Sequence, residues 1–276
     1  MESLVSTEWL AVRLGEPDLV PVDCSWFLPS FQRDPKVEFL ERHIPGARFF
    51  DIDEVADRFD LAPHMLPGAE QFGRAMEALG VGSGDRIVVY DNSPHHVSAR
   101  GWFTFRHFGA RQVAILDGGL GKWVGEGRPV ESGEPKSRKA AFEAREGGDV
   151  VAKSQILAGL DLPLLDARGR ARFEGSEPDP RGGVTAGHIP GARNLPSAEL
   201  YNADGTFKSV DELERLFAEA GVEPRNPFVA SCGSGVTACS LLFAAHLLGN
   251  DRNRLYDGSW SEWGADPATP KALGPA

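Results

Sequence analysis

The chain has 276 residues, of which 41% are hydrophobic and 25% charged, and this balance is typical of a water-soluble globular protein. Its net charge of −11 argues against nucleic acid or an anionic membrane as a partner, because both are themselves negative. Its three cysteines are too few for a disulfide framework and suit a reducing compartment. No signal peptide is visible, and no apolar run approaches the roughly 20 residues of a membrane-spanning helix, so we expect a cytoplasmic protein.

In chain order, the first half of the sequence predicts an α/β domain over residues 1–135. Short apolar runs at residues 19–23 and 86–90 are typical of buried strands, and an amphipathic helix between them ends at Gly80. Strands that alternate with helices form a mostly parallel sheet with helices on both faces.

The second half predicts the same kind of domain over residues 150–276. Its first two buried strands are expected at residues 162–166 and 228–231, again with an amphipathic helix between them. Residues 136–149 are rich in charge, glycine and alanine and lack apolar periodicity, so they are predicted to be the linker.

Internal matches indicate that the two domains are copies of each other. The segment 43–48 reads His-Ile-Pro-Gly-Ala-Arg and returns at residues 188–193, and an Asp-Gly pair before a tryptophan at residues 117–118 returns at 257–258. Matches with such similar separations imply two copies of one domain, whereas the repeats of a solenoid are far shorter.

The cysteine loop, residues 232–237, reads Cys-Gly-Ser-Gly-Val-Thr and lies between a predicted strand and an apolar helix. In such a turn the backbone N–H groups curl around the sulfur, and the positive end of the helix dipole points at it. Both effects favour the thiolate, so Cys232 is predicted to be a nucleophile. The alternative is a buried cysteine in a tight turn.

Only one copy carries this cysteine. The same count along the chain leads from Gly221 to Cys232 and from Gly80 to Asp91, so the first copy has an aspartate at the position of the nucleophile. Because a carboxylate cannot accept sulfur, the first domain is predicted to be catalytically inactive.

The cysteine loop resembles the active-site loop of the rhodanese (sulfurtransferase) family, and its form is most similar to that of the 3-mercaptopyruvate sulfurtransferases. Four further segments resemble family signatures, in family order: residues 43–47, 172–178, 187–191 and 257–260. The resemblance implies two tandem rhodanese-like domains that need no metal or other cofactor. It also implies that sulfur passes from 3-mercaptopyruvate through a Cys232 persulfide to a thiol, a thioredoxin-like protein or cyanide, with release of pyruvate.

The resemblance further assigns roles to residues around the cysteine. Five residues of the loop would hold the charged sulfur with their N–H groups: Gly233, Ser234, Gly235, Val236 and Thr237. Ser234 would form a Ser-His-Asp relay with His64 and Asp53. By the residues alone, an isolated histidine is more often structural, and a serine in a turn more often bonds local backbone.

Two arginines, Arg172 and Arg181, flank a proline-rich loop, and the resemblance implies that they hold the substrate carboxylate. A guanidinium offers two parallel donors to a carboxylate, which fixes its orientation as well as its charge. The alternative is a pair of surface arginines bound to Glu174, Glu177 or Asp179.

Several other conspicuous residues are predicted to be structural. The remaining cysteines are expected in the core, and two recurring histidines and an Asp-x-Arg pair are expected to stabilise turns and strand ends: Cys24, Cys239, His43, His188, Asp166 and Arg168.

Three other functions compete with this reading. Thiosulfate sulfurtransferases typically carry Arg and Lys after the cysteine, which suit a dianion, whereas Gly233 and Ser234 are neutral. Cysteine-dependent phosphatases need an arginine where this chain has Ala238. A non-enzymatic sulfur carrier or interaction module would not need the intact loop together with Arg172 and Arg181.

Overall fold

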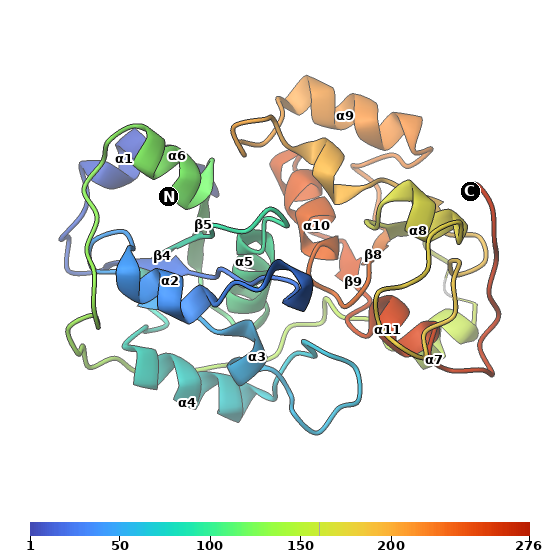
Figure 1. The fold of residues 1–276 in the computed structure, drawn as a ribbon, viewed down its shortest axis with the longest axis horizontal. Coiled ribbons are helices and arrows are strands. Elements are labelled where there is room, and N and C mark those ends of the chain that lie inside the picture. The colour runs from blue at the N-terminus through green and yellow to red at the C-terminus, as the bar shows by residue number, and fades with distance from the viewer. Residues whose placement is uncertain (160) are drawn as a thin grey trace. The chain divides into compact units, whose positions relative to one another are not determined.

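The structure, a computed structural model, describes residues 1–159 and 161–276. The chain forms two compact units (Figure 1). Unit 1 contains residues 1–56, 66–148 and 202–207, and unit 2 contains residues 57–65, 149–201 and 208–276. Each half of the sequence therefore contributes one short segment to the unit built mainly from the other half.

Unit 1 is built on a five-stranded parallel sheet in the order β1-β5-β4-β2-β3. Its strands are β1 (Leu4–Val5), β2 (Leu19–Asp23), β3 (Arg48–Phe49), β4 (Arg86–Tyr90) and β5 (Gln112–Leu116). Its helices are α1 (Thr7–Ala11), α2 (Pro35–Glu41), α3 (Ile52–Val55), α4 (Ala69–Leu79), α5 (Ser98–His107) and α6 (Gly119–Gly125), with a 3₁₀ turn, η1 (Pro29–Phe31). The two strands predicted in this half are β2 and β4.

Both faces of this sheet are covered, because successive side chains of a strand point to opposite sides. Val88 and Tyr90 of β4 belong to a core cluster with residues of α1, α2 and α6. An aromatic cluster joins α4 to α5, where the ring centroid of Phe72 lies 4.3 Å from that of Phe108. Figure 1 shows α6 and α4 on opposite sides of the sheet of unit 1.

The segment predicted as the linker contacts unit 1 at several points, and residues up to 148 belong to that unit. Arg138 forms a bidentate ion pair with Asp85, with N–O distances of 2.6 and 2.7 Å. The buried ring of Phe142 lies 5.3 Å from that of Phe72. Residues 136–148 are therefore part of a packed unit.

Unit 2 is built on a four-stranded parallel sheet in the order β7-β6-β8-β9. Its strands are β6 (Leu164–Asp166), β7 (Arg193–Asn194), β8 (Val229–Ser231) and β9 (Arg254–Leu255). Its helices are α7 (Lys153–Leu157), α8 (Arg170–Glu174), α9 (Val210–Glu219), α10 (Ala238–Leu247) and α11 (Ser259–Trp263), with a 3₁₀ turn, η2 (Ser197–Leu200). This order repeats β3-β2-β4-β5 of unit 1, which confirms the prediction of two tandem α/β domains of one fold.

The recurring histidines occupy matching positions in the two units. His43 stacks on Phe39 at 4.1 Å and donates from Nδ1 to the carbonyl of that phenylalanine. His188 stacks on Phe173 at 3.8 Å and donates to its carbonyl in the same way. Their predicted structural role is confirmed, and Phe39 and Phe173 are equivalent positions of the two copies.

None of the helices in the described part of the chain combines the length and apolar character that crossing a membrane requires.

Candidate active site

Cys232 lies in the turn between β8 and α10 of unit 2 (Figure 1). Cys232 is almost fully buried, with 1% of its surface exposed. The turn depends on Gly235, whose φ of +74° lies in the left-handed region that favours glycine. The predicted strand-to-helix position of the cysteine is therefore confirmed.

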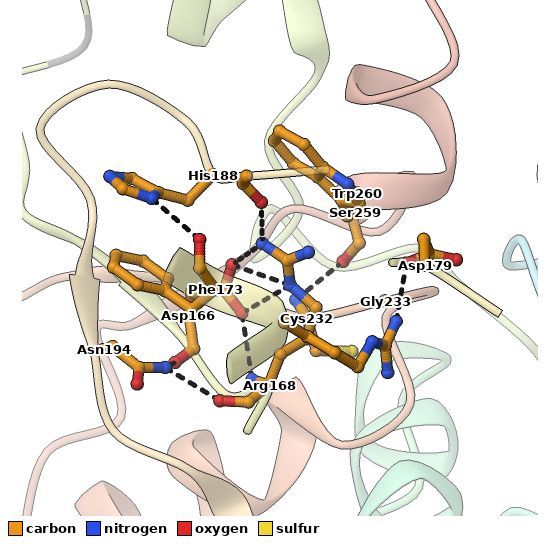
Figure 2. A network of polar contacts seen from close by, with 12 residues as sticks. Asp166, Arg168, Phe173, Asp179, His188, Asn194, Cys232, Gly233, Ser259 and Trp260 are labelled. Carbon is orange, nitrogen blue, oxygen red and sulfur yellow. Dashed lines mark hydrogen bonds and ion pairs between the residues drawn. The ribbon is translucent and has the colours of Figure 1, made fainter. Parts of the chain in front are cut away.

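The segment before α11 holds the cysteine loop in place. Ser259 Oγ accepts the N–H group of Cys232 at 3.1 Å (Figure 2). It also accepts the N–H group of Gly235 at 3.0 Å and donates to the carbonyl of Tyr256. The N–H of Trp260 donates to the Cys232 carbonyl at 3.0 Å. In the sequence, the Asp-Gly-Ser segment at residues 257–259 is recognisable only as a family signature. The role of Ser259 in holding the cysteine loop was not predicted.

The N–H groups of the loop have different partners. That of Gly235, predicted to face the sulfur, is used by Ser259 Oγ. Among the described residues, no acceptor pairs with the backbone N–H of Gly233, Ser234, Val236 or Thr237. These four donors are therefore free to bind a negative charge in the loop, whereas Gly235 contributes chiefly its backbone conformation.

Ser234 and His64 are brought together as predicted. The serine Oγ lies 2.9 Å from Nδ1 of His64, which is buried and belongs to the segment 57–65 of unit 2. His64 itself has a φ of +64°. The third member of the predicted relay, Asp53, belongs to α3 of unit 1 and accepts the indole N–H of Trp26 at 2.9 Å.

The two predicted substrate arginines share one carboxylate. Arg172 Nη2 donates to Asp179 Oδ2 at 2.6 Å, and Arg181 donates from Nε to Oδ1 at 2.8 Å and from Nη2 to Oδ2 at 3.0 Å. Burial opposes ionisation of Asp179, but the hydrogen bonds from Arg181 and then Arg172 outweigh it and lower its pKa to about 2. The ion pairing considered as an alternative is thus present, with Asp179 as the partner.

The same arginines also reach the cysteine loop. Arg181 Nη1 donates to the Gly233 carbonyl at 2.7 Å and also contacts Ser261 Oγ. A Cβ atom on Gly233 would lie 2.7 Å from Nη2 of Arg181 and 3.4 Å from Nη2 of Arg172. Glycine beside the cysteine therefore leaves the space that the two guanidinium groups occupy.

A second buried network contacts Trp260, the residue whose N–H binds the Cys232 carbonyl (Figure 2). Arg168 donates from Nη2 to Asp166 at 2.7 Å and to the Gly187 carbonyl at 2.9 Å, and its guanidinium lies 4.6 Å from the ring centroid of Trp260. Both ion-pair side chains are only 2% exposed. The predicted structural pair is confirmed.

Unit 1 carries different chemistry at the matching positions. Asp91, at the position of the cysteine, accepts the N–H groups of Ser93 and Ser98 at 2.8 and 2.7 Å. Asn92 lies at the position of Gly233, and its amide Nδ2 is 3.4 Å from Oε2 of Glu38, which precedes the stacked Phe39 as Arg172 precedes Phe173. A cavity of about 530 Å³ is lined by Glu38 and Asn92 together with Arg33, which is ion-paired with Glu38 at 2.6 Å.

The other two cysteines are core residues, as predicted. Cys239 is fully buried on α10, with its Sγ 3.2 Å from the Gly235 carbonyl. Cys24 is also buried, and burial raises the pKa of its thiol well above the ordinary value. Within the described residues, no cluster of three or more His, Cys, Asp or Glu side chains could hold a metal ion.

Taken together, the repeated fold and the cysteine loop define a two-domain α/β protein with a cysteine at a strand-to-helix turn of its second unit. The sequence model of the rhodanese-like domain family matches residues 6–126 and again residues 151–266, so the chain belongs to this family.

Similar proteins include sulfurtransferases of two kinds. The chain is 42% identical over 271 residues to the 3-mercaptopyruvate sulfurtransferase of Mus musculus, covering 95% of this chain and 91% of that protein. It is 38% identical over 271 residues to the thiosulfate sulfurtransferase of Gallus gallus, covering 95% and 93%. The crystal structure of SseA from Escherichia coli, a 3-mercaptopyruvate sulfotransferase by its description, aligns with a TM-score of 0.86 at 37% identity, covering 95% of this chain and all of that chain.

Proposed function

We propose that this protein is a sulfurtransferase that takes sulfur from 3-mercaptopyruvate onto Cys232 and delivers it to a thiol or cyanide, releasing pyruvate. The observation that carries this proposal is the convergence of Arg172 and Arg181 on Gly233, the residue beside the cysteine. Guanidinium groups suit a carboxylate, so their position beside Gly233 supports a 2-oxo acid that carries a thiol as the substrate.

In the first half-reaction, the Cys232 thiolate attacks the sulfur of the substrate. A new S–S bond forms, the S–C bond breaks, and its electron pair leaves with the three-carbon fragment as the enolate of pyruvate, which then takes up a proton. The hydroxyl of Ser234, hydrogen-bonded to His64, is the group that we assign to the developing enolate oxygen. Asp53 is retained as the proposed third member of this relay.

In the second half-reaction, the acceptor attacks the outer sulfur of the persulfide, the S–S bond breaks, and Cys232 leaves as a thiolate. Both half-reactions put negative charge on sulfur in the turn. The unpaired N–H groups of Gly233, Ser234, Val236 and Thr237 can stabilise that charge.

Unit 1 supplies internal support for an anion at this position of the fold. In the equivalent turn, the carboxylate of Asp91 accepts two backbone N–H groups, one of them from Ser98, the first residue of α5. A strand-to-helix turn of this fold therefore holds a negative charge in the one copy where the charge is built into the sequence.

Thiosulfate is the rival donor, as the similarity to the chicken enzyme indicates. An arginine side chain after the cysteine would enter the space of the Arg181 guanidinium, because even a Cβ atom at Gly233 would be 2.7 Å from it. The arrangement of the described residues thus favours the carboxylate-bearing donor. The lack of an arginine at Ala238 continues to argue against phosphatase chemistry.

The decisive experiment is mass spectrometry of the reduced protein after exposure to 3-mercaptopyruvate or to thiosulfate, with pyruvate measured in parallel. We expect one added sulfur atom on Cys232, multiple turnovers of pyruvate, and little loading from thiosulfate. Cys232→Ser should abolish both loading and turnover, whereas Cys239→Ser, in the core of α10, should retain them.

Other outcomes would redirect the proposal. Loading chiefly from thiosulfate would overturn the donor, a single equivalent of pyruvate would indicate a sulfur carrier, and turnover by Cys232→Ser would overturn the mechanism.

The acceptor and the compartment are proposed more broadly. A thioredoxin-like dithiol is the protein acceptor that we propose, to be tested by adding it to the persulfide form and measuring loss of the extra sulfur mass. A reducing, cytoplasmic location is supported by three buried cysteines that form no disulfide, and cell fractionation would test it.

A further inference from the structure

Asp179 lies between the two arginines of the site in sequence and in space. Its carboxylate accepts one hydrogen bond from Arg172 and two from the side chain of Arg181, and its Oδ1 also accepts the Arg181 backbone N–H at 3.1 Å. The carboxylate side chain is only 2% exposed, while those of the arginines are 24% and 28% exposed. The buried carboxylate of Asp179 thus fixes the orientation of two partly exposed guanidinium groups.

The two arginines differ in what they have left to offer. Arg181 is occupied on three of its nitrogens, because Nε and Nη2 bind Asp179 while Nη1 binds the Gly233 carbonyl and Ser261. Arg172 uses Nη2 on Asp179, and its buried Nε has no acceptor among the described residues. Arg172 is therefore the arginine with donors available to a ligand, and Arg181 ties Asp179 to the cysteine loop.

The charge of this cluster is as informative as its geometry. Two guanidinium groups would present two positive charges beside the cysteine, and the ionised Asp179 cancels one of them. One net positive charge matches the single carboxylate of 3-mercaptopyruvate. It matches the thiosulfate dianion poorly, because a dianion gains more from each additional nearby cation.

We propose that Asp179 is a positioning and specificity-determining residue, which orients Arg172 for a monoanionic 2-oxo acid, anchors Arg181 at the cysteine loop and disfavours dianionic thiosulfate. This inference rests on the proposed function, since it concerns the choice between its two donors.

The test compares kcat/KM for 3-mercaptopyruvate and for thiosulfate in wild type, Asp179→Asn, Asp179→Glu and Glu199→Gln. Glu199 pairs with exposed Arg170 and serves as a matched loss of a carboxylate outside the site. For Asp179→Asn we expect kcat/KM for thiosulfate, divided by kcat/KM for 3-mercaptopyruvate, to rise at least about tenfold. The decrease in kcat/KM for 3-mercaptopyruvate should come mainly from a higher KM. Asp179→Glu and Glu199→Gln should keep the wild-type ratio within about twofold.

A ratio measured on one preparation does not depend on the fraction of folded enzyme, so a merely structural role would lower both activities and leave the ratio unchanged. That unchanged ratio would overturn the inference. If Asp179→Asn does not fold, Asp179→Ser removes the charge and keeps an oxygen acceptor for the Arg181 N–H, and the same ratio decides. A wild type that is not loaded by 3-mercaptopyruvate would instead refute the proposed function, independently of Asp179.

Discussion

At the scale of single residues, the surroundings of Cys232 set its chemistry. The residue is 1% exposed, so its loop decides what reaches the sulfur. Ser259 Oγ occupies two of the loop's N–H groups and leaves others unpaired, and Gly233 leaves room for the two arginines. Ser234 has a different partner, because its hydroxyl meets the ring of His64 at 2.9 Å.

This contact makes a residue-scale prediction about the relay. Ser234→Ala and His64→Asn should each lower kcat for 3-mercaptopyruvate by about a hundredfold, the lower end of what a positioned proton-transfer group contributes. Asparagine is the substitution of choice because it tolerates the left-handed backbone of His64, whose φ is +64°. The double variant should be no slower than the single ones, since the two residues act as a unit.

Steady-state kinetics of the three variants and of Asp53→Asn would check this. Losses that multiply in the double variant would mean that Ser234 and His64 act separately. An Asp53→Asn variant with wild-type kcat would remove Asp53 from the relay, and its hydrogen bond from Trp26 would then be purely structural.

At the scale of elements, the two copies use the same strand-to-helix turn in different ways. In unit 1 the turn between β4 and α5 carries Asp91. Its carboxylate accepts the N–H of Ser98, the first residue of α5, and so acts as a capping group although it lies seven residues before that serine. In unit 2 the equivalent turn carries Cys232, and the hydroxyl of Ser259 holds the loop instead. The same turn thus carries a carboxylate in one copy and, in the other, the sulfur that we propose to be reactive.

We therefore predict that Asp91→Ala lowers the free energy of unfolding by about 1–2 kcal/mol, the usual range for loss of a helix-capping side chain. Chemical denaturation followed by circular dichroism would measure the change. Asp211→Ala, at an exposed position in the first turn of α9, is the control and should change stability by less than about 0.5 kcal/mol. Equal effects of the two substitutions would contradict the capping role of Asp91.

At the scale of the whole molecule, two carboxylates give stability opposite dependences on pH. Burial, together with the nearby charge of Asp91, raises the pKa of Asp23 in unit 1 to about 7, against the hydrogen bonds from Ser25. Its contribution to stability is complete below about pH 4 and is lost as pH rises through about 7. Asp179 in unit 2, with a pKa of about 2, contributes above about pH 4 and loses that contribution as pH falls toward 2.

The Asp23→Asn variant should separate these effects. Because asparagine does not titrate, the free energy of unfolding of the variant relative to wild type should increase from pH 4 to pH 8. The increase should be on the order of 2 kcal/mol and at most about 4 kcal/mol, the upper value corresponding to the full change in the pKa of Asp23. Urea denaturation at both pH values would test this, with Asp211→Asn as the control, and a difference independent of pH would show that folding does not raise the pKa of Asp23.

The local sequence pattern was sufficient to predict a large part of the fold and the position of the cysteine loop. Strand and helix periodicity, the repeated His-Ile-Pro-Gly segment and the position of Cys232 between β8 and α10 are properties of neighbouring residues, so they can be predicted from sequence. The repeat alone was enough to align Asp91 with Cys232, which predicts that the first domain is catalytically inactive. The resemblance to a family added the roles of Arg172 and Arg181, which charge by itself would have left as surface residues.

Only the tertiary structure decided how distant groups meet. The packing of residues 136–148 against unit 1, the exchange of segments 57–65 and 202–207, and the hold of Ser259 on the cysteine loop each depend on contacts between residues far apart in the chain. So does the placement of both arginines beside Gly233, which turns a local ion pair with Asp179 into part of the site. Periodicity and spacing report which face of an element is buried, whereas the partner of each polar group is set by the packing of whole elements, and that information is not local.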